Sequence, residues 1–132
     1  MAFRCDGHNE SLTVFTPVGT RQTAFLIDGY PFDGWRATLH FLDGDGGRYD
    51  PKAALGRRIQ PKQTYQLDIY VRLSGAKSDI EVQLDSKPLY HWHGLNHRLS
   101  RNPRFRDLPP GNIGFGAHYE GWVVTSAKVR RL

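Results

Sequence analysis

Two histidines flank a tryptophan in the segment KPLYHWHG, and imidazole nitrogens are common zinc ligands. Residues two apart in a strand share a face, so His91 and His93 could bind one metal ion together. A zinc site needs a third ligand, and only His97 follows closely in the sequence. The alternative is that both histidines face solvent while Tyr90 and Trp92 pack inward. We favour this solvent-facing arrangement over zinc.

Acidic residues gather in the segment LDGDGGRYDP, where Asp43 and Asp45 offer oxygen ligands of the kind that calcium prefers. The helix-loop-helix calcium pattern requires an acidic or amide residue at its fifth position and glycine at its sixth. Those positions hold Gly47 and Arg48. The segment therefore favours a plain turn, with calcium as the alternative.

Carboxylates that could catalyse glycoside hydrolysis are scarce. Such an enzyme needs two of them, about 5 to 9.5 Å apart in a cleft. The glutamates are Glu10, Glu81 and Glu120, and none lies in a paired acidic strand motif. The serines lack the context of an activated nucleophile. We therefore predict a non-catalytic protein, with a glycoside-active enzyme as the third hypothesis.

Aromatic side chains point instead to carbohydrate binding, because each sugar ring has an apolar C–H face and a fringe of hydroxyls. The candidate ligand surface includes Trp35, Trp92, Tyr119 and Trp122, with Arg98 as a hydrogen-bond donor. The alternative for each tryptophan is a place in the core. Weak glycan binding is the leading hypothesis, and a structural or protein–protein interaction role is its rival.

Basic residues outnumber acidic ones by 18 to 13, which gives a net charge of +5. Four arginines crowd residues 98–106 around Phe105, an arrangement that could clamp phosphate or an anionic glycan. No nucleic-acid motif accompanies them. We therefore predict a solvated loop and no nucleic-acid partner.

Short strand candidates separated by turn signals place these residues in an all-β sandwich or barrel. The candidates cover residues 11–16, 21–28, 35–43, 64–73, 78–85 and 87–94, and two more strands lie within 111–132. Residues 64–132 are predicted to form a β-meander. In 64–73 and 78–85 apolar and polar residues alternate, which predicts one buried face.

The 132 residues suit one domain with a single core, and the start MAFRC looks like the beginning of a domain excised from a longer protein. We find no signal peptide and no stretch of about 20 apolar residues that could span a bilayer. We expect a soluble domain of unpredicted compartment. Cys5 is the only cysteine, so an intrachain disulfide is excluded.

Several segments resemble a known superfamily. The matching stretches are Leu12 to Gly29, HFLDG (His40 to Gly44), Tyr65 to Gly75, LDSKPLYHW (Leu84 to Trp92) and the closing GNIGFGAHYEGWVVTSAKVRRL. Their order is similar to the concanavalin A-like lectin/glucanase (laminin-G-like jelly-roll) superfamily, near the bacterial 3-keto-disaccharide hydrolase-like (DUF1080) sandwich domains.

The resemblance implies a two-sheet antiparallel jelly roll and, by association, glycan binding. We expect no cofactor, with calcium or zinc as the alternatives. Such domains commonly have one or two strands ahead of the point where this chain begins, and here only Ala2 to Cys5 could supply them. An unpaired edge strand could then mediate a homodimer.

Overall fold

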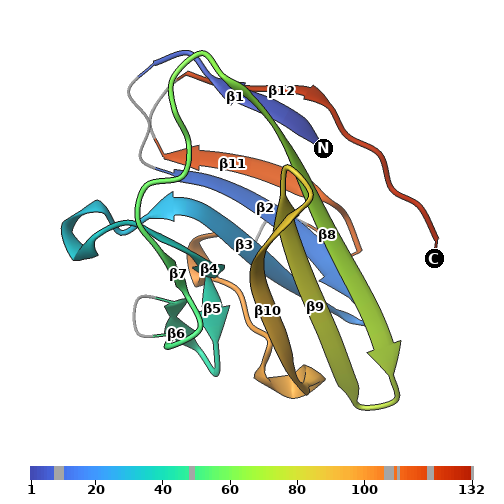
Figure 1. Cartoon of the computed structure of the whole chain (residues 1–132). Coiled ribbons are helices and arrows are strands. Elements are labelled where there is room, and N and C mark those ends of the chain that lie inside the picture. Colours follow the sequence, from blue (N-terminus) through green and yellow to red (C-terminus); the bar gives the residue numbers. More distant parts are fainter. Residues whose placement is uncertain (8–10, 48–49, 106–108, 110, 119–120, 132) are drawn as a thin grey trace.

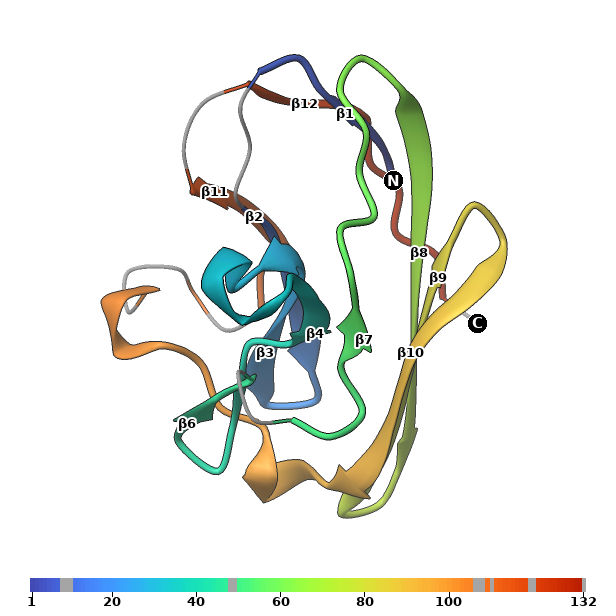
Figure 2. The same ribbon diagram turned by 60° about the vertical axis from the view of Figure 1, so that its left-hand side comes forward.

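Two five-stranded antiparallel sheets pack face to face in the computed structural model, which describes residues 1–7, 11–47, 50–105, 109, 111–118 and 121–131 (Figures 1 and 2). The first sheet has the strand order β10-β9-β8-β1-β12 and the second β11-β2-β3-β4-β7, while β5 and β6 pair as a separate short hairpin. In chain order, with η for a 3₁₀ helix, the elements are β1 (Ala2–Cys5), β2 (Ser11–Val18), β3 (Arg21–Gly29), η1 (Pro31–Asp33), β4 (Arg36–Leu39), β5 (Phe41–Leu42), β6 (Asp45–Gly46), β7 (Ala54–Leu55), β8 (Thr64–Ser74), β9 (Lys77–Leu84), β10 (Lys87–Leu95), η3 (Asn96–Arg98), η4 (Pro103–Phe105), β11 (Gly114–His118) and β12 (Trp122–Ser126).

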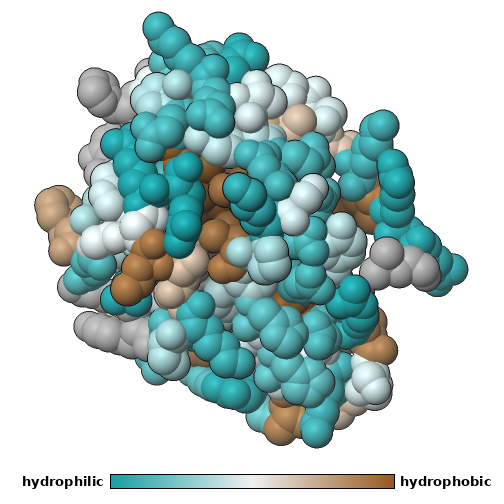
Figure 3. All heavy atoms as spheres, in the orientation of Figure 1, coloured by the Kyte–Doolittle hydropathy of each residue, from teal (hydrophilic) through white to brown (hydrophobic). Residues whose placement is uncertain are grey.

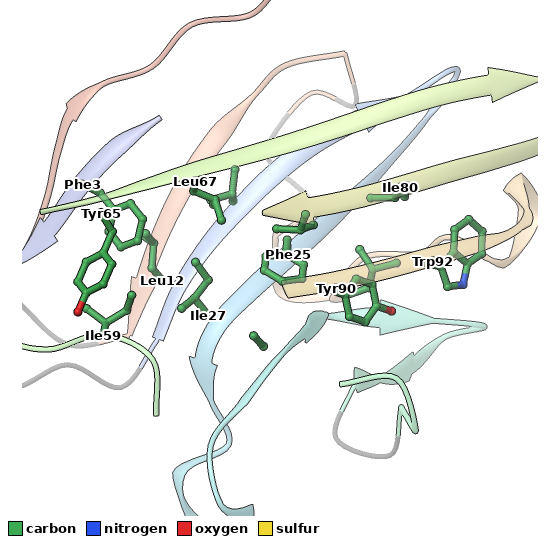
Figure 4. Close-up of a cluster of buried hydrophobic side chains, with 14 of the residues drawn as sticks. Phe3, Leu12, Phe25, Ile27, Ile59, Tyr65, Leu67, Ile80, Tyr90 and Trp92 are labelled. Carbon is green, nitrogen blue, oxygen red and sulfur yellow. The ribbon is translucent and has the colours of Figure 1, made fainter. Parts of the chain in front are cut away.

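The hydrophobic core lies between the two sheets, and both contribute alternate side chains to it (Figure 4). From the first sheet come residues such as Phe3, Leu67 and Ile80, and from the second Phe25 and Ile27. Each of these side chains is at most 2% exposed. Burial of a large apolar side chain stabilises a fold by about 1.5 to 3 kcal/mol, so this layer is the main source of stability.

The second sheet is also covered on its outer face. Phe15 in β2 is 3% exposed and packs edge-to-face on Phe105 of η4, with 5.0 Å between ring centroids. The side-chain amide of Gln22 donates to the carbonyls of Pro109 and Asn112. The segment after β10 therefore crosses to the second sheet and packs on it, as the orange trace in Figure 2 shows. The solvated loop that we predicted is only partly right, since Leu99 is buried while Arg98 and Arg104 are exposed.

The alternation predicted in β9 and in the first part of β8 is confirmed: Leu67 and Ile80 face the core, while Glu81 faces outward. It is not seen at the end of β8, where Leu73 is 55% exposed. The predicted meander over residues 64–132 is only partly right. Strands β8, β9 and β10 form a meander, but β11 pairs with β2 and β12 pairs with β1. Sequence alternation specifies which residues share a face and leaves the partner strand open, which is why this prediction failed.

One further strand prediction is wrong, and the early strand that only Ala2 to Cys5 could supply is present. The stretch 35–43 is not one strand, since β4 ends at Leu39 and Phe41–Leu42 turns away to pair with β6. The residues at the start of the chain, Ala2–Cys5, form β1, which lies between β8 and β12 in the interior of the first sheet. The sheet edges among the described residues are β10, β12, β11 and β7.

A hydrogen-bonded carboxylate joins the two sheets near their β10 and β4 strands. One oxygen of Asp50 accepts from the Tyr90 hydroxyl at 2.5 Å and from the Thr38 hydroxyl at 3.0 Å. Burial, followed by the nearby carboxylate, raises the pKa of Tyr90, so this phenol stays protonated and remains a donor. The contact fixes the two sheets relative to each other at the side of the sandwich where β10 and β4 face each other.

Candidate functional site

An exposed group of aromatic and apolar side chains lies where the chain leaves β3. We call it the aromatic corner and define it by five residues: Tyr30, Phe32, Trp35, Leu55 and Arg57. Phe32 is 97% exposed and Leu55 is 59% exposed, whereas Tyr30 and Trp35 are half-buried. In Figure 3 brown side chains project at the left-hand edge of the molecule, where the segment between β3 and β4 projects in Figure 1.

The backbone of the corner is tightly constrained. Tyr30 and Trp35 have φ angles of 53° and 60°, in the left-handed region that large side chains seldom adopt. The carbonyl of Tyr30 accepts hydrogen bonds from the amides of Asp33 and Trp35, and Gly56 donates to the carbonyls of Gly34 and Trp35. Such strained residues persist only where the surrounding structure fixes them, and they concentrate at binding and catalytic sites.

Trp35 carries a cation on one side of its ring. The Cζ atom of Arg57 lies over the indole, 5.0 Å from its centroid. The segment that supplies Arg57 is anchored by Asp28, whose buried carboxylate accepts from the backbone amides of Arg58 and Ile59 at 2.8 and 3.0 Å. Burial raises the pKa of Asp28 above its ordinary 3.8, and the two amide donors and the charges of Arg57 and Arg58 oppose that rise.

Of the predicted ligand surface, only Trp35 lies in this corner. Trp92 is 3% exposed in the core, so the structure removes it from any exposed surface. Trp122 is half-buried against Phe3, with 5.9 Å between ring centroids, and its Nε1 atom is buried without a partner among the described residues. Trp92 and Trp122 lie on the opposite edge strands β10 and β12, about 19 Å apart at a strand spacing of about 4.8 Å. Tyr119 lies outside the described residues.

Arg98, the predicted hydrogen-bond donor, is paired with one of the predicted calcium ligands. Its Nε and Nη2 atoms lie 3.0 and 2.9 Å from one carboxylate oxygen of Asp43. The hydrogen bond lowers the pKa of Asp43 and raises that of Arg98. A calcium ion at Asp43 would have to displace this guanidinium, while Asp45 is exposed on β6.

The predicted zinc ligands lie on the exposed face of the first sheet, with Tyr90 and Trp92 facing inward as predicted. Asp79 of β9 lies 3.1 Å from Nε2 of His91 and 3.7 Å from Nδ1 of His93. The hydrogen bond with His91 is the main cause that lowers the pKa of Asp79. In the described part of the chain, no three His, Cys, Asp or Glu side chains are grouped as a metal ion would need.

Sequence reasoning missed three residues that the structure brings into view. Phe32 stands in GYPFDG, where flanking glycines and a proline exclude a strand or helix interior, so its exposure had a sequence signal. Asp79 also had one, because it alternates with Ile80 and so faces outward with Glu81. Arg57 had no sequence signal, because it is 22 positions from Trp35 and reaches it only through strand pairing.

Compared with known proteins, the chain matches no family model, no curated protein and no solved structure. Among the described residues, no helix has both the length and the apolar character needed to cross a membrane. The functional argument therefore rests on the geometry of the residues described above.

Proposed function

We propose that this domain binds carbohydrate, without catalysis, through the aromatic corner. The observation that carries the proposal is Phe32, a phenyl ring that is 97% exposed at the tip of a constrained turn. An apolar ring in water costs free energy unless a partner covers it. The C–H face of a sugar ring is such a partner, and aromatic residues supply it with a large surface at low conformational cost.

Polar groups next to the ring suit the hydroxyl fringe of a sugar. The Arg57 guanidinium is held over Trp35, and guanidinium groups donate several hydrogen bonds in one plane. The corner therefore offers a donor for sugar hydroxyls beside its aromatic rings.

The rigidity and the shape of the corner indicate the class of glycan. A turn already fixed by hydrogen bonds loses little conformational entropy on binding. Sites for small molecules are usually concave, whereas Phe32 projects from the surface. We therefore favour an extended polysaccharide, which can lie across a projecting ring, over an enclosed monosaccharide.

The same proposal includes kinship with the concanavalin A-like superfamily. Its support is the order of the segments noted in the sequence together with the two five-stranded antiparallel sheets. Fold alone does not establish function, so the binding proposal stands on the corner.

A glycan array with neutral and sulfated polysaccharides tests the proposal, with retained protein read by fluorescence. We expect the wild type to be retained on at least one glycan, equally with and without calcium because Arg98 occupies Asp43. Phe32→Ala should weaken that retention at least about tenfold. The control is Leu73→Ala, an apolar residue on β8 that is 55% exposed, which should bind as the wild type does.

The result that would overturn the proposal is a folded wild type that no glycan retains. Sedimentation velocity would then test the rival hypothesis, a structural or protein–protein interaction role. Self-association that Phe32→Ala abolishes would make the corner a contact between copies of this chain.

A further inference from the structure

Part of strand β8 has an open edge within the first sheet. Strand β1 pairs with Thr64–Gln66, and Met1 pairs with Leu67 through main-chain hydrogen bonds of 2.8 Å in both directions. Beyond that point β8 continues to Ser74 with only β9 beside it among the described strands, as Figure 1 shows. Residues 68–74 therefore have one paired side and one unpaired side.

The alternation of the backbone shows which main-chain groups face the unpaired side. The amide and carbonyl of Leu67 point toward β1, since both bond to Met1. Residues two apart in a strand direct these groups the same way, so those of Ile69, Val71 and Leu73 face the unpaired side. No described residue supplies them with a hydrogen-bond partner. Such a row of free amides and carbonyls is a template for another strand.

The inward side chains along this edge also lose their cover. Leu67, beside Met1, is 2% exposed, whereas Ile69 and Val71 are half-buried against the core and Leu73 is 55% exposed. A strand placed next to β8 at this point would remove apolar surface from water. Main-chain pairing and apolar burial would therefore act together at the open edge.

Exposed edges of native sheets usually carry a device against pairing, such as proline, lysine, a bulge or a charge that points inward. Strand β10 has Pro88 with a register shift beside it, and β7 has only two residues. Residues 68–74, all of them described, have no such device, because their charged residues Asp68 and Arg72 alternate with the inward set. The open edge of β8 is therefore free to pair.

We propose that two copies of this chain pair through this edge, antiparallel, with Val71 opposite the partner's Val71. Ile69 then lies opposite the partner's Leu73, so that the free amides and carbonyls of both copies bond to one another. The inward face of the contact holds apolar pairs alone. On the outward face Tyr70 lies opposite the partner's Arg72, and Arg72 already lies 5.9 Å from the Tyr70 ring centroid within one copy.

Charge and space are compatible with this register. Asp68 lies opposite the partner's Ser74, so like charges do not face each other across the two-fold axis. The partner's β9 would lie next to the described residues after β12, 127–131, which are exposed and belong to no strand, so they can move aside. The dimer does not rest on the aromatic corner, because none of the five corner residues lies in β8.

Sedimentation equilibrium of the whole chain, from about 1 µM to about 1 mM, tests the dimer over the range of weak interfaces. We expect a monomer–dimer equilibrium. Leu73→Lys should weaken dimerisation at least about tenfold, because it places a charge on the inward face of the contact. The exposure of Leu73 lets this variant fold.

Two further variants serve as controls for that charge. Leu73→Ala removes the side chain without adding a charge and should largely retain the dimer, since the main-chain bonds remain. Leu95→Lys adds the same charge at the end of β10, where Leu95 is 39% exposed, and should dimerise as the wild type does.

Amide hydrogen exchange at low and high protein concentration locates the contact without any variant. The amides of Ile69 and Val71 should exchange more slowly at high concentration. Those of Tyr70 and Arg72 point toward β9 in the same strand, so their exchange should not change.

A monomer at every concentration would overturn the proposal and leave the edge to an extended segment of another protein. A dimer that Leu73→Lys leaves unchanged, or that Leu95→Lys dissociates, would also overturn it. Phe32→Ala should dimerise as the wild type does, so the dimer and the binding of glycan by the aromatic corner can fail separately.

Discussion

The guanidinium of Arg57 covers one side of the indole of Trp35, with 5.0 Å between its Cζ atom and the ring centroid. The two residues come from segments that only the pairing of β4 with β7 brings together. This contact orders Trp35 at the base of the turn that presents Phe32. It links the strand pairing of the second sheet to the proposed binding surface.

The contact between Trp35 and Arg57 should be measurable as a coupling energy. We expect a double-mutant cycle of Trp35→Ala and Arg57→Ala, followed by denaturant unfolding, to give about 1 kcal/mol of favourable coupling. The control cycle pairs Trp35→Ala with Arg58→Ala, because the Arg58 guanidinium donates to the Leu55 carbonyl instead. Equal coupling in both cycles would contradict a specific cation–π contact.

Asp28 should be the most sensitive polar residue near the aromatic corner. Asp28→Ala leaves the amides of Arg58 and Ile59 without their acceptor, and we expect a loss of about 2 to 4 kcal/mol in the free energy of unfolding. Asp28→Asn is the matched control, because asparagine keeps one acceptor and tolerates the φ of 52°. It should lose about half as much, and equal losses for both variants would contradict the two-acceptor role.

The pH dependence of the Asp28 effect has a definite sign. Burial raises the folded pKa above 3.8, so between 3.8 and the folded pKa the folded protein holds a proton that the unfolded chain has released. The contribution of this proton to the free energy of unfolding is fully present below pH 3.8, and it is lost as the pH rises through the folded pKa. The stability difference between wild type and Asp28→Asn should therefore shrink as the pH rises from 3.8 through the folded pKa of Asp28.

Tyr90 should stabilise the sandwich through its hydroxyl as well as its ring. Tyr90→Phe removes the bond to Asp50 that joins the two sheets, and urea unfolding should show a loss of about 1 to 3 kcal/mol. Tyr70→Phe is the control, since Tyr70 is half-buried on the exposed face of the same sheet. A loss of the same size for Tyr70→Phe would show that the bond to Asp50 contributes nothing.

Strand faces were readable from the sequence because the side-chain period of a strand is two. Alternation correctly placed Leu67 and Ile80 inward and His91 and His93 outward. The pairing partners of β11 and β12 were not readable, because pairing with β2 and β1 depends on contacts across 99 or more positions in the chain. The sequence signal that we missed is the nearly continuous run of apolar residues in β2 and β3. Strands that are buried along their whole length are covered on both faces of the sheet, so a further segment had to pack on the outer face.

The site was less predictable than the fold, for a physical reason. A tryptophan fills a core as well as it stacks on a ligand, and sequence cannot distinguish the two roles. Trp92 and Trp35 illustrate this, one 3% exposed and the other half-buried beside a cation. Phe32 was identifiable only from the glycines and proline around it.

The half-buried carboxylate of Asp79 offers a last test, by NMR titration of its carboxyl carbon. The hydrogen bond with His91 lowers its pKa, so the stability it contributes is present above 3.8 and is lost as pH falls through the lower folded pKa. His91→Gln should move the titration midpoint up toward 3.8, and His93→Gln should move it less, because His93 acts only through its charge at 3.7 Å. His97→Gln is the control: His97 is exposed in η3 and its charge acts on Asp43, so the midpoint of Asp79 should not move. A midpoint that His91→Gln leaves unchanged would show that the histidine does not hold this carboxylate.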